Sequence, residues 1–399
     1  MSPPPRTPGK GSSLLTGKAL RLASRLRAKL IGRQPTAAAT LDLSAPEVSR
    51  DPFPHYENLR RDGPVHFLPR QGFWLVVGYN EVYTALMRPE VFSNRVSDYQ
   101  QVDRVLLGTD PPEHAAARRV VGRIFSAQAL EAQAPFVERD AERLLRPLLA
   151  GEPFEVMRDF AAPLVEDTAA HLIGFDESAV ASIRAAHVNA PHLQGLFDSL
   201  DSIIEDAADQ THVYDRLLRS GEAGLAGPQA RSLIRLLWIA GTTTTRRAIA
   251  SSVLLLLRHT EARRRVESEP SLLPAFVEES LRLHPPERML SRVAADEAEL
   301  SGVKIAAGAS VKLCVAAANR DPSRFERPAS LLLERTPNRQ LSFSGGIHRC
   351  VGAALARTEM LVALRVLLRL APGFRTARPL DTLGYAGFAN DTERLEIEC

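Results

Sequence analysis

A glycine-rich loop leading into a predicted helix carries a cysteine, the residue of this chain best placed to do chemistry. Residues 341–357 read LSFSGGIHRCVGAALAR, with Cys350 just before the helix. A helix N-terminus presents free N–H groups and partial positive charge, which lower a thiol pKa and stabilise the thiolate. Gly346 and Gly352 have no Cβ atom, so a flat ligand could approach the backbone there, and Phe343 could screen the sulfur from water.

Two other interpretations of Cys350 are open on the residues alone. A lone cysteine after a turn is more often a buried structural residue than a reactive one. A nucleophilic cysteine would need a histidine base within hydrogen-bond reach, and His348 is close in sequence. No residue that would orient this histidine is evident from the sequence.

The residues around the cysteine resemble those of a known family. Phe343, Gly346, Cys350 and Gly352 fit F-x-x-G-x-x-x-C-x-G, the haem-ligand signature of the cytochrome P450 enzymes. By chance, these four fixed residues would occur in about 4 of 10,000 such chains. The resemblance covers about residues 50–399. It implies a mainly α domain with a small β part that binds haem b, with Cys350 as the axial thiolate ligand of the iron.

The resemblance also implies four partners for the haem propionates. His114 and Arg118 fit the family's H-x-x-x-R helix, in which the i,i+4 spacing puts both side chains on one face. Arg292 and His348 fit the other two propionate positions. Two carboxylates at the edge of an apolar cofactor need such donors. Taken singly, each of these residues would be interpreted as a solvated surface charge.

A charged cluster of structural importance is implied as well. Glu279 and Arg282 fit the family's E-x-x-R motif and precede Leu-His-Pro-Pro, as they do in the family. Such i,i+3 pairs are common on helix surfaces and carry little weight alone. Arg335 fits the arginine that joins the pair. The three residues would hold the loop that leads to Cys350.

The long helix departs from the family pattern at one catalytic position. Where the family usually has A-G-x-(Asp/Glu)-Thr, residues 240–244 read AGTTT. Gly241 fits the glycine that opens a helix bulge beside the iron, and Thr244 fits the alcohol that orders water and dioxygen. Thr243 occupies the acid position, and a hydroxyl cannot act as a general acid near neutral pH. Protons would therefore travel through ordered water, come from a polar substrate group, or be made unnecessary by peroxide.

Three charged residues fall where the family usually lines its substrate pocket with apolar side chains. Arg247 shares the helix face of Thr243 and Thr244. Glu287 and Arg288 lie in the loop before the strand that is expected to carry the third propionate donor. These charges could pair with each other or face solvent. Alternatively, one arginine could bind a substrate carboxylate.

Sequence patterns predict the elements that would position these residues. Strands are expected at Val65–Phe67 and Phe73–Val77, joined by a turn at 70–72, and further strands near 303–305 and 311–315. Residues 80–285 have an almost wholly helical pattern, with a long helix from 228 to about 259. A last long helix is expected at 353–370. The probable pocket roof, 88–107 and 176–215, follows no pattern that identifies a substrate.

Charge divides the chain into two parts. Residues 1–40 contain eight Lys and Arg and no acid, whereas the rest of the chain is mildly acidic, so the fold itself is not expected to bind nucleic acid. Residues 13–33 form a basic amphipathic pattern, interpreted as a solubilising tail, a targeting segment or a weak membrane-surface contact. Residues 41–399 are expected to form one haem-thiolate domain. Three irregularly spaced cysteines argue against a disulfide framework or a structural zinc site, and the expected location is cytoplasmic.

The resemblance implies a monooxygenase that inserts one atom of dioxygen into a small lipophilic metabolite, with or without a carboxylate. Electrons would come from a separate ferredoxin and its reductase, docking on the cysteine side near Arg349 and Arg119. Two alternatives are open. One is a peroxide-driven peroxygenase, which the threonine at the acid position favours. The other is a non-catalytic haem-binding helper or sensor protein.

Overall fold

The computed structural model describes residues 36–96, 105–189, 200–203, 228–380, 383–386, 391–392 and 394–399. The amphipathic pattern predicted at 13–33 and parts of the predicted pocket roof lie outside these residues. The first described element is the short helix α2, Thr36–Thr40, and the domain boundary at residue 40 stays a prediction.

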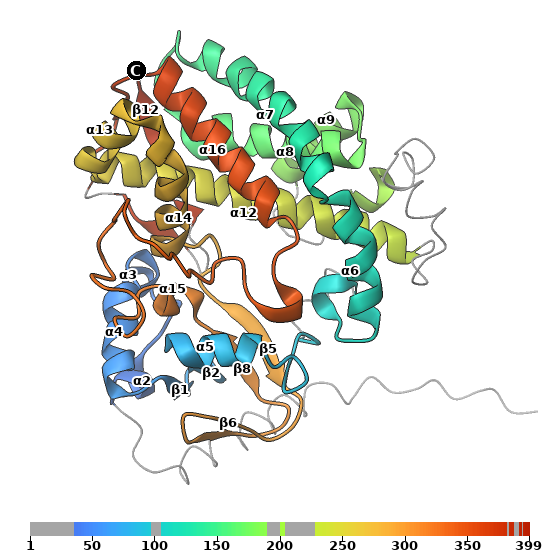
Figure 1. The fold of residues 1–399 in the computed structure, drawn as a ribbon, viewed down its shortest axis with the longest axis vertical. Helices are drawn as coiled ribbons and strands as arrows, with labels where there is room; N and C mark the ends of the chain where they lie inside the picture. Colours follow the sequence, from blue (N-terminus) through green and yellow to red (C-terminus); the bar gives the residue numbers. More distant parts are fainter. Residues whose placement is uncertain are drawn as a thin grey trace, which may run out of the picture.

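Long helices make up most of the described chain (Figure 1). The longer ones are α6 (Glu113–Ile124), α7 (Ala127–Leu148), α8 (Ala162–Ile173), α9 (Glu177–Asn189), α12 (Pro228–Arg258), α13 (Thr260–Ser268), α14 (Leu273–Leu283) and α16 (Ala353–Leu370). Shorter helices are α3 (Pro46–Arg50), α4 (Phe53–Asp62), α5 (Tyr79–Leu86) and α15 (Val315–Ala318). The helix α12 packs against α8, α14 and α16, and α16 packs against α7.

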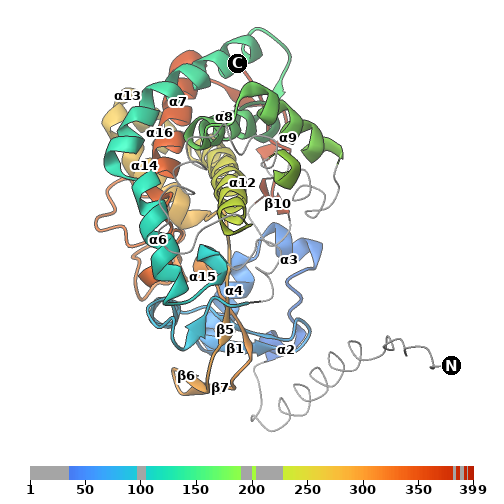
Figure 2. The same cartoon turned by 90° about the vertical axis from the view of Figure 1, so that its right-hand side faces the viewer.

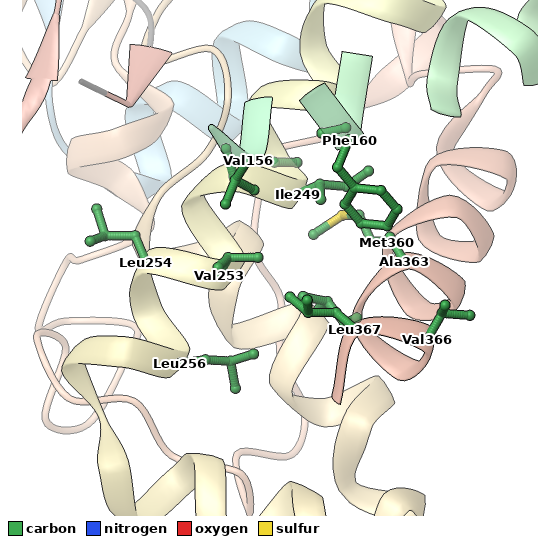
Figure 3. Packing of buried hydrophobic residues seen from close by; sticks show 14 of the residues in the cluster. Val156, Phe160, Ile249, Val253, Leu254, Leu256, Met360, Ala363, Val366 and Leu367 are labelled. Carbon is green, nitrogen blue, oxygen red and sulfur yellow. The ribbon is translucent and has the colours of Figure 1, made fainter. Parts of the chain in front are cut away.

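The central helix α12 follows from its sequence. Pro228 suits the first turn of a helix. The helix runs from there to Arg258, 31 residues in all, which confirms the predicted long helix. At 1.5 Å per residue it is roughly 46 Å long, enough to cross the domain. Its C-terminal half is buried among the apolar side chains of α16 and of the π-helical turn η3, Val156–Ala161 (Figure 3).

The largest sheet has the strand order β1-β2-β8-β5-β3. The predicted hairpin is confirmed: β1 (Val65–Leu68) pairs antiparallel with β2 (Phe73–Val76). The strand β8 (Ser310–Leu313) runs parallel to β2 and antiparallel to β5 (Leu290–Ala294), which pairs with β3 (Phe92–Ser93). The predicted strand at 311–315 ends earlier, because residue 315 begins α15.

The remaining strands are short. They are β4 (Phe154–Glu155), β6 (Ala298–Leu300), β7 (Val303–Ile305), β9 (Arg375–Thr376), β10 (Tyr385–Ala386), β11 (Asp391–Thr392) and β12 (Glu396–Glu398). The strand predicted at 303–305 and the helix predicted at 353–370 are confirmed. Within 80–285, where an almost wholly helical pattern is predicted, the structure adds β3 and β4, which are two-residue strands paired with partners far along the chain.

The sheet and the helical layers occupy opposite ends of the molecule (Figure 2). In Figure 1, the segment before α16 passes between these ends, close to α5 and α6. This arrangement confirms the predicted fold class, a mainly α domain with a small β part. Within the described ranges, no helix is long and apolar enough to cross a membrane.

Candidate haem-binding site

The loop that carries Cys350 is held in a closed turn. The backbone N–H of Cys350 donates to the carbonyl of Phe343 at 2.8 Å, and a single 3-10 turn, η6 (Gly346–His348), lies between them. The helix α16 begins at Ala353, after Gly352. The sequence-based prediction therefore places the cysteine correctly, just ahead of a helix N-terminus.

The environment of the sulfur raises its pKa. Cys350 is exposed at one side, yet the protein on its other sides desolvates the thiolate form and raises the thiol pKa. Four groups lower the thiol pKa, but their combined effect is smaller than that of desolvation: the backbone N–H of Gly352 and the guanidinium groups of Arg118, Arg357 and Arg349. The lowered pKa expected from the helix N-terminus is therefore wrong for the protein alone. A metal cation bonded to sulfur would reverse the balance, because coordination deprotonates a thiol.

The glycine at position 346 is required by the packing of the chain itself. Gly346 has φ +61°, and a Cβ atom there would lie 2.5 Å from the carbonyl oxygen of Leu86 in α5. At Gly352, a Cβ atom would make an ordinary 3.6 Å contact with the ring of Phe125. The predicted clearance for a flat ligand stays a prediction, and the structure shows a further reason for a glycine at Gly346. The loop needs this glycine in order to rest on the end of α5.

Four predicted propionate donors meet beside this loop from three different elements. His114 in α6 and Arg292 in β5 are 2% and 3% exposed, and the rings of His114 and His348 lie 4.2 Å apart. Arg118 lies one turn beyond His114 and close enough to lower its pKa, although burial is the larger cause. The structure thus brings the four predicted residues to one place.

The surroundings of His348 disfavour its charged form. Burial, His114 and Arg292 together lower the pKa of His348 to about 3. The buried Nε2 atom of His348 has no hydrogen-bond partner, and a carboxylate oxygen of Asp110 is 3.8 Å away. Donors whose charged forms are destabilised, together with a nitrogen that lacks a partner, fit a ligand with buried carboxylates. The residues present therefore fit a haem with its two propionates.

Asp110 is a part of this cluster that the sequence analysis missed. Its carboxylate accepts the hydroxyl of Ser93 at 2.5 Å and the N–H of Asn94 at 3.2 Å, and lies 3.5 Å from Arg95. It therefore ties the end of β3 to the start of α6 and faces His348. The only sequence signal is its position four residues before His114.

The predicted Glu279 cluster is assembled in the structure. Arg282 Nε and Arg335 Nε lie 2.6 and 3.0 Å from the same carboxylate oxygen of Glu279. The backbone N–H of Leu332 and the side-chain amide of Asn338 also donate to this carboxylate, at 2.8 and 3.0 Å. Glu279 and Arg282 are 1% and 0% exposed. The bonds from Leu332, Arg335 and Asn338 to Glu279 therefore hold the segment before the cysteine loop against α14.

The threonines of α12 are regular members of the helix. The hydroxyls of Thr243 and Thr244 donate to the carbonyls of Ile239 and Ala240, at 2.7 and 3.0 Å. The helix runs without interruption through Gly241, so the bulge implied there by the family is not present. A Cβ atom at Gly241 would meet nothing within 4 Å, which leaves open space along this side of the helix.

The three charged residues near the expected pocket separate into two environments. Arg247 pairs with Glu287 at 2.8 Å, which is the pairing that the sequence analysis left open. Arg288 is 2% exposed, and its charge acts on Tyr56, Cys314 and His284 in the core under α4. The structure thus shows an ion pair between Arg247 and Glu287 and a buried position for Arg288.

A buried acid beside α12 is a second residue that the sequence analysis missed. Glu359 in α16 is 3% exposed and hydrogen-bonds with the hydroxyls of Thr245 in α12 and Thr168 in α8. Desolvation raises its pKa well above the ordinary value of 4.5. The residues three and four positions away along α16 are the apolar Leu355, Ala356, Val362 and Ala363, so an acid on this face of the helix was the available signal.

Comparison with known proteins identifies the family. The family model of cytochrome P450 matches residues 206–370. The vitamin D(3) 25-hydroxylase of Pseudonocardia autotrophica is 31% identical over 371 residues, which cover 86% of this chain and 92% of that relative. The chain therefore belongs to the cytochrome P450 family. It is an oxidoreductase, a haem-thiolate monooxygenase.

Solved structures show the same fold. A myxobacterial cytochrome P450 in complex with myristic acid matches with a TM-score of 0.82 and 29% identity, over 90% of this chain and 99% of that one. P450BioI in complex with an acyl carrier protein ligated to hexadec-9Z-enoic acid matches with a TM-score of 0.77 and 27% identity, over 88% and 99% of the two chains.

Removing the carboxylate of Glu279 should destabilise the protein strongly. The Glu279→Ala variant leaves the buried charge of Arg282 uncompensated, which costs about 3–5 kcal/mol. Urea unfolding followed by circular dichroism measures this loss. The control is Glu261→Ala, which removes the exposed partner of Arg264 and should leave the unfolding midpoint nearly unchanged. Equal midpoints for both variants would contradict the structural role of Glu279.

The stability contribution of Glu359 should depend on pH with a defined sign. Because its pKa is raised on folding, the folded protein keeps a proton that the unfolded chain releases above pH 4.5. The contribution is complete below that pH and is lost as the pH rises toward the folded pKa. Glu359→Gln cannot ionise, so its stability relative to the wild type should increase as the pH rises above about 4.5. Urea midpoints across this range test the prediction, and a constant difference would refute it.

Proposed function

We propose that Cys350 is the axial thiolate ligand of a haem b group whose propionates are bound by His114, Arg118, Arg292 and His348. The observation that carries the proposal is the buried Nε2 of His348, which lacks a partner within a cluster of cationic donors beside the cysteine loop. Membership of the cytochrome P450 family supports the same assignment.

The bound haem would supply the activation of dioxygen and the oxidation of the substrate, with the thiolate favouring O–O cleavage. The residues of this chain hold and orient the cofactor. Phe343 fixes the cysteine N–H through its carbonyl, and Gly346 lets the loop rest on α5. Glu279, Arg282 and Arg335 keep the preceding segment in place. Each group therefore acts by limiting movement of the sulfur.

On the opposite side of the proposed haem, we assign the handling of water to Thr244. Its hydroxyl proton is directed to the carbonyl of Ala240, so the oxygen is available to accept a hydrogen bond from a water molecule. Thr243 is bonded to its own helix in the same way and supplies no acid. Gly241 leaves open space beside them. We therefore propose that protons reach the site through ordered water.

A peroxygenase is the second candidate function. The observation that favours it is the hydroxyl of Thr243 at the position where the family usually has an acid, with the cation of Arg247 one turn further on. Peroxide already carries the protons and electrons that the monooxygenase must deliver. Turnover with hydrogen peroxide alone, at a rate equal to the electron-driven reaction, would select this function.

For the substrate we propose a small lipophilic metabolite. Two solved relatives were crystallised with a fatty acid or a fatty-acyl carrier protein, which supports an apolar chain as the substrate class. Arg247 already binds the carboxylate of Glu287, so a substrate carboxylate would have to replace that partner. The proposal therefore rests on apolar character and not on a charged group.

The electron donor is proposed to be an acidic ferredoxin-type protein, reduced by its own reductase. Arg349 and Arg119 are exposed on the cysteine side. Ile347 in the cysteine loop and Met87 at the end of α5 are large exposed apolar residues, and the loop touches α5 at Gly345, whose Cβ would lie 3.9 Å from the Met87 sulfur. Basic residues around an apolar centre fit an acidic partner with an apolar contact.

The thiolate assignment has a direct spectroscopic test. Wild-type protein reconstituted with haem should give the carbon monoxide difference spectrum of a thiolate-ligated haem, and Cys350→Ala should lose it because no other sulfur can replace the ligand. Cys399→Ala, which alters another exposed cysteine, is the control and should keep the spectrum. An unchanged Soret band in Cys350→Ala would overturn the proposal.

The docking proposal predicts a charge effect on the electron donor. Arg119→Glu should raise the apparent Kd for an acidic ferredoxin about five- to tenfold at low salt, and the effect should shrink as salt screens it. Ferredoxin titrations followed by the rate of haem reduction measure the change. Arg264→Glu reverses an exposed arginine on α13 and should have no effect. Equal Kd values for the two variants would exclude the proposed face.

A further inference from the structure

Arg357, in the first turns of α16, lies over the aromatic ring of the cysteine loop. Its guanidinium carbon is 4.4 Å from the centre of the Phe343 ring. The carbonyl of Phe343 in turn accepts the N–H of Cys350 at 2.8 Å. A guanidinium group over a ring face is held by the negative charge density of the ring. A positive charge is thus fixed against the turn that carries the sulfur.

Glu278, in α14, holds this guanidinium with both oxygens. Arg357 Nε lies 2.5 Å from one oxygen of Glu278, and a terminal nitrogen lies 3.2 Å from the other. The same carboxylate accepts the amide of Gln340 at 3.2 Å, just before the cysteine loop. A bidentate pair fixes direction as well as distance. The arginine side chain therefore cannot turn away while this pair is intact.

The charge of Arg357 is fixed close to the cysteine turn. The guanidinium lies against the Phe343 ring, and the carbonyl of Phe343 accepts the N–H of Cys350, so one residue separates the charge from the turn that carries the sulfur. Side-chain exposures of 31% for Arg357 and 27% for Glu278 leave the pair only partly screened by solvent. Opposite charges at fixed positions therefore lie within electrostatic reach of the proposed ligand.

We infer that the Arg357–Glu278 pair tunes the reduction potential of the haem, with Arg357 raising it and Glu278 limiting the rise. The inference rests on the proposed role of Cys350 as the haem ligand. Reduction adds negative charge to the iron–thiolate unit, and a fixed cation near the sulfur stabilises that charge. The carboxylate cancels part of this effect. Potentials of such centres respond to charge and hydrogen bonding around the ligand.

Redox titration of the reconstituted protein, followed by its absorption spectrum, gives the test. Arg357→Gln should shift the reduction potential downward, because it removes the cation and leaves the carboxylate. Glu278→Gln should shift it upward, because the cation loses its counter-charge. The double variant should return close to the wild-type value. Arg365→Gln and Glu138→Gln, which alter an exposed pair between α16 and α7, are the matched controls and should not move it.

A merely structural role of the pair predicts a different result. Loosening of the loop would shift both single variants in the same direction and would lower thermal stability together with the potential. The carbon–oxygen stretching frequency of the carbon monoxide complex is a second readout, which should fall in Arg357→Gln and rise in Glu278→Gln as electron donation from sulfur changes. Shifts of equal sign, or shifts no larger than in the controls, overturn the inference.

The outcome also separates this inference from the proposed function. If wild-type protein does not give a thiolate-type carbon monoxide spectrum, the assignment of Cys350 fails. If it does give that spectrum while neither potential moves, only the tuning role of Arg357 fails. Should Arg357→Gln not fold, Glu278→Gln decides alone, since an upward shift supports the inference and an unchanged or lower potential refutes it.

Discussion

The buried carboxylate of Glu279 is the interaction on which the rest of the site depends. It compensates the charge of Arg282, which is 0% exposed, and also accepts hydrogen bonds from Arg335 and from the backbone of Leu332. A buried charge is tolerable only when every polar atom around it has a partner. This requirement fixes the segment from 328 to 341 against α14, and the cysteine loop continues from that fixed segment.

The donor cluster is the second constraint. Unlike the Glu279 cluster, whose charges compensate one another, it is unfavourable for the protein alone. His114, Arg292 and His348 come from α6, β5 and the cysteine loop and are gathered where burial disfavours their charged forms. Such a gathering is unfavourable by itself, and two carboxylates of a bound cofactor would remove the penalty. A haem bound in the proposed way would couple folding and cofactor binding through the same side chains.

The helix α12 joins these two parts of the molecule. One face is fixed to α16 and α8 through the carboxyl of Glu359, whose pKa is raised by burial, and the hydroxyls of Thr245 and Thr168. The adjoining residues Thr243 and Thr244 bond to their own helix and leave acceptor oxygens available. Glu359 in α16 is thus an acid bound in the core, while the position of α12 that usually has an acid in the family carries the hydroxyl of Thr243.

Local rules made much of this structure predictable from sequence. Turn residues and strand alternation determined the β1–β2 hairpin, helical periodicity determined α12 and α16, and motif spacing singled out Cys350 and the Glu279 pair. Tertiary structure alone decided the sign of the cysteine pKa shift, the need for Gly346 against Leu86, and the burial of Arg288. These properties depend on desolvation and on contacts between residues far apart in the chain, which no local pattern encodes.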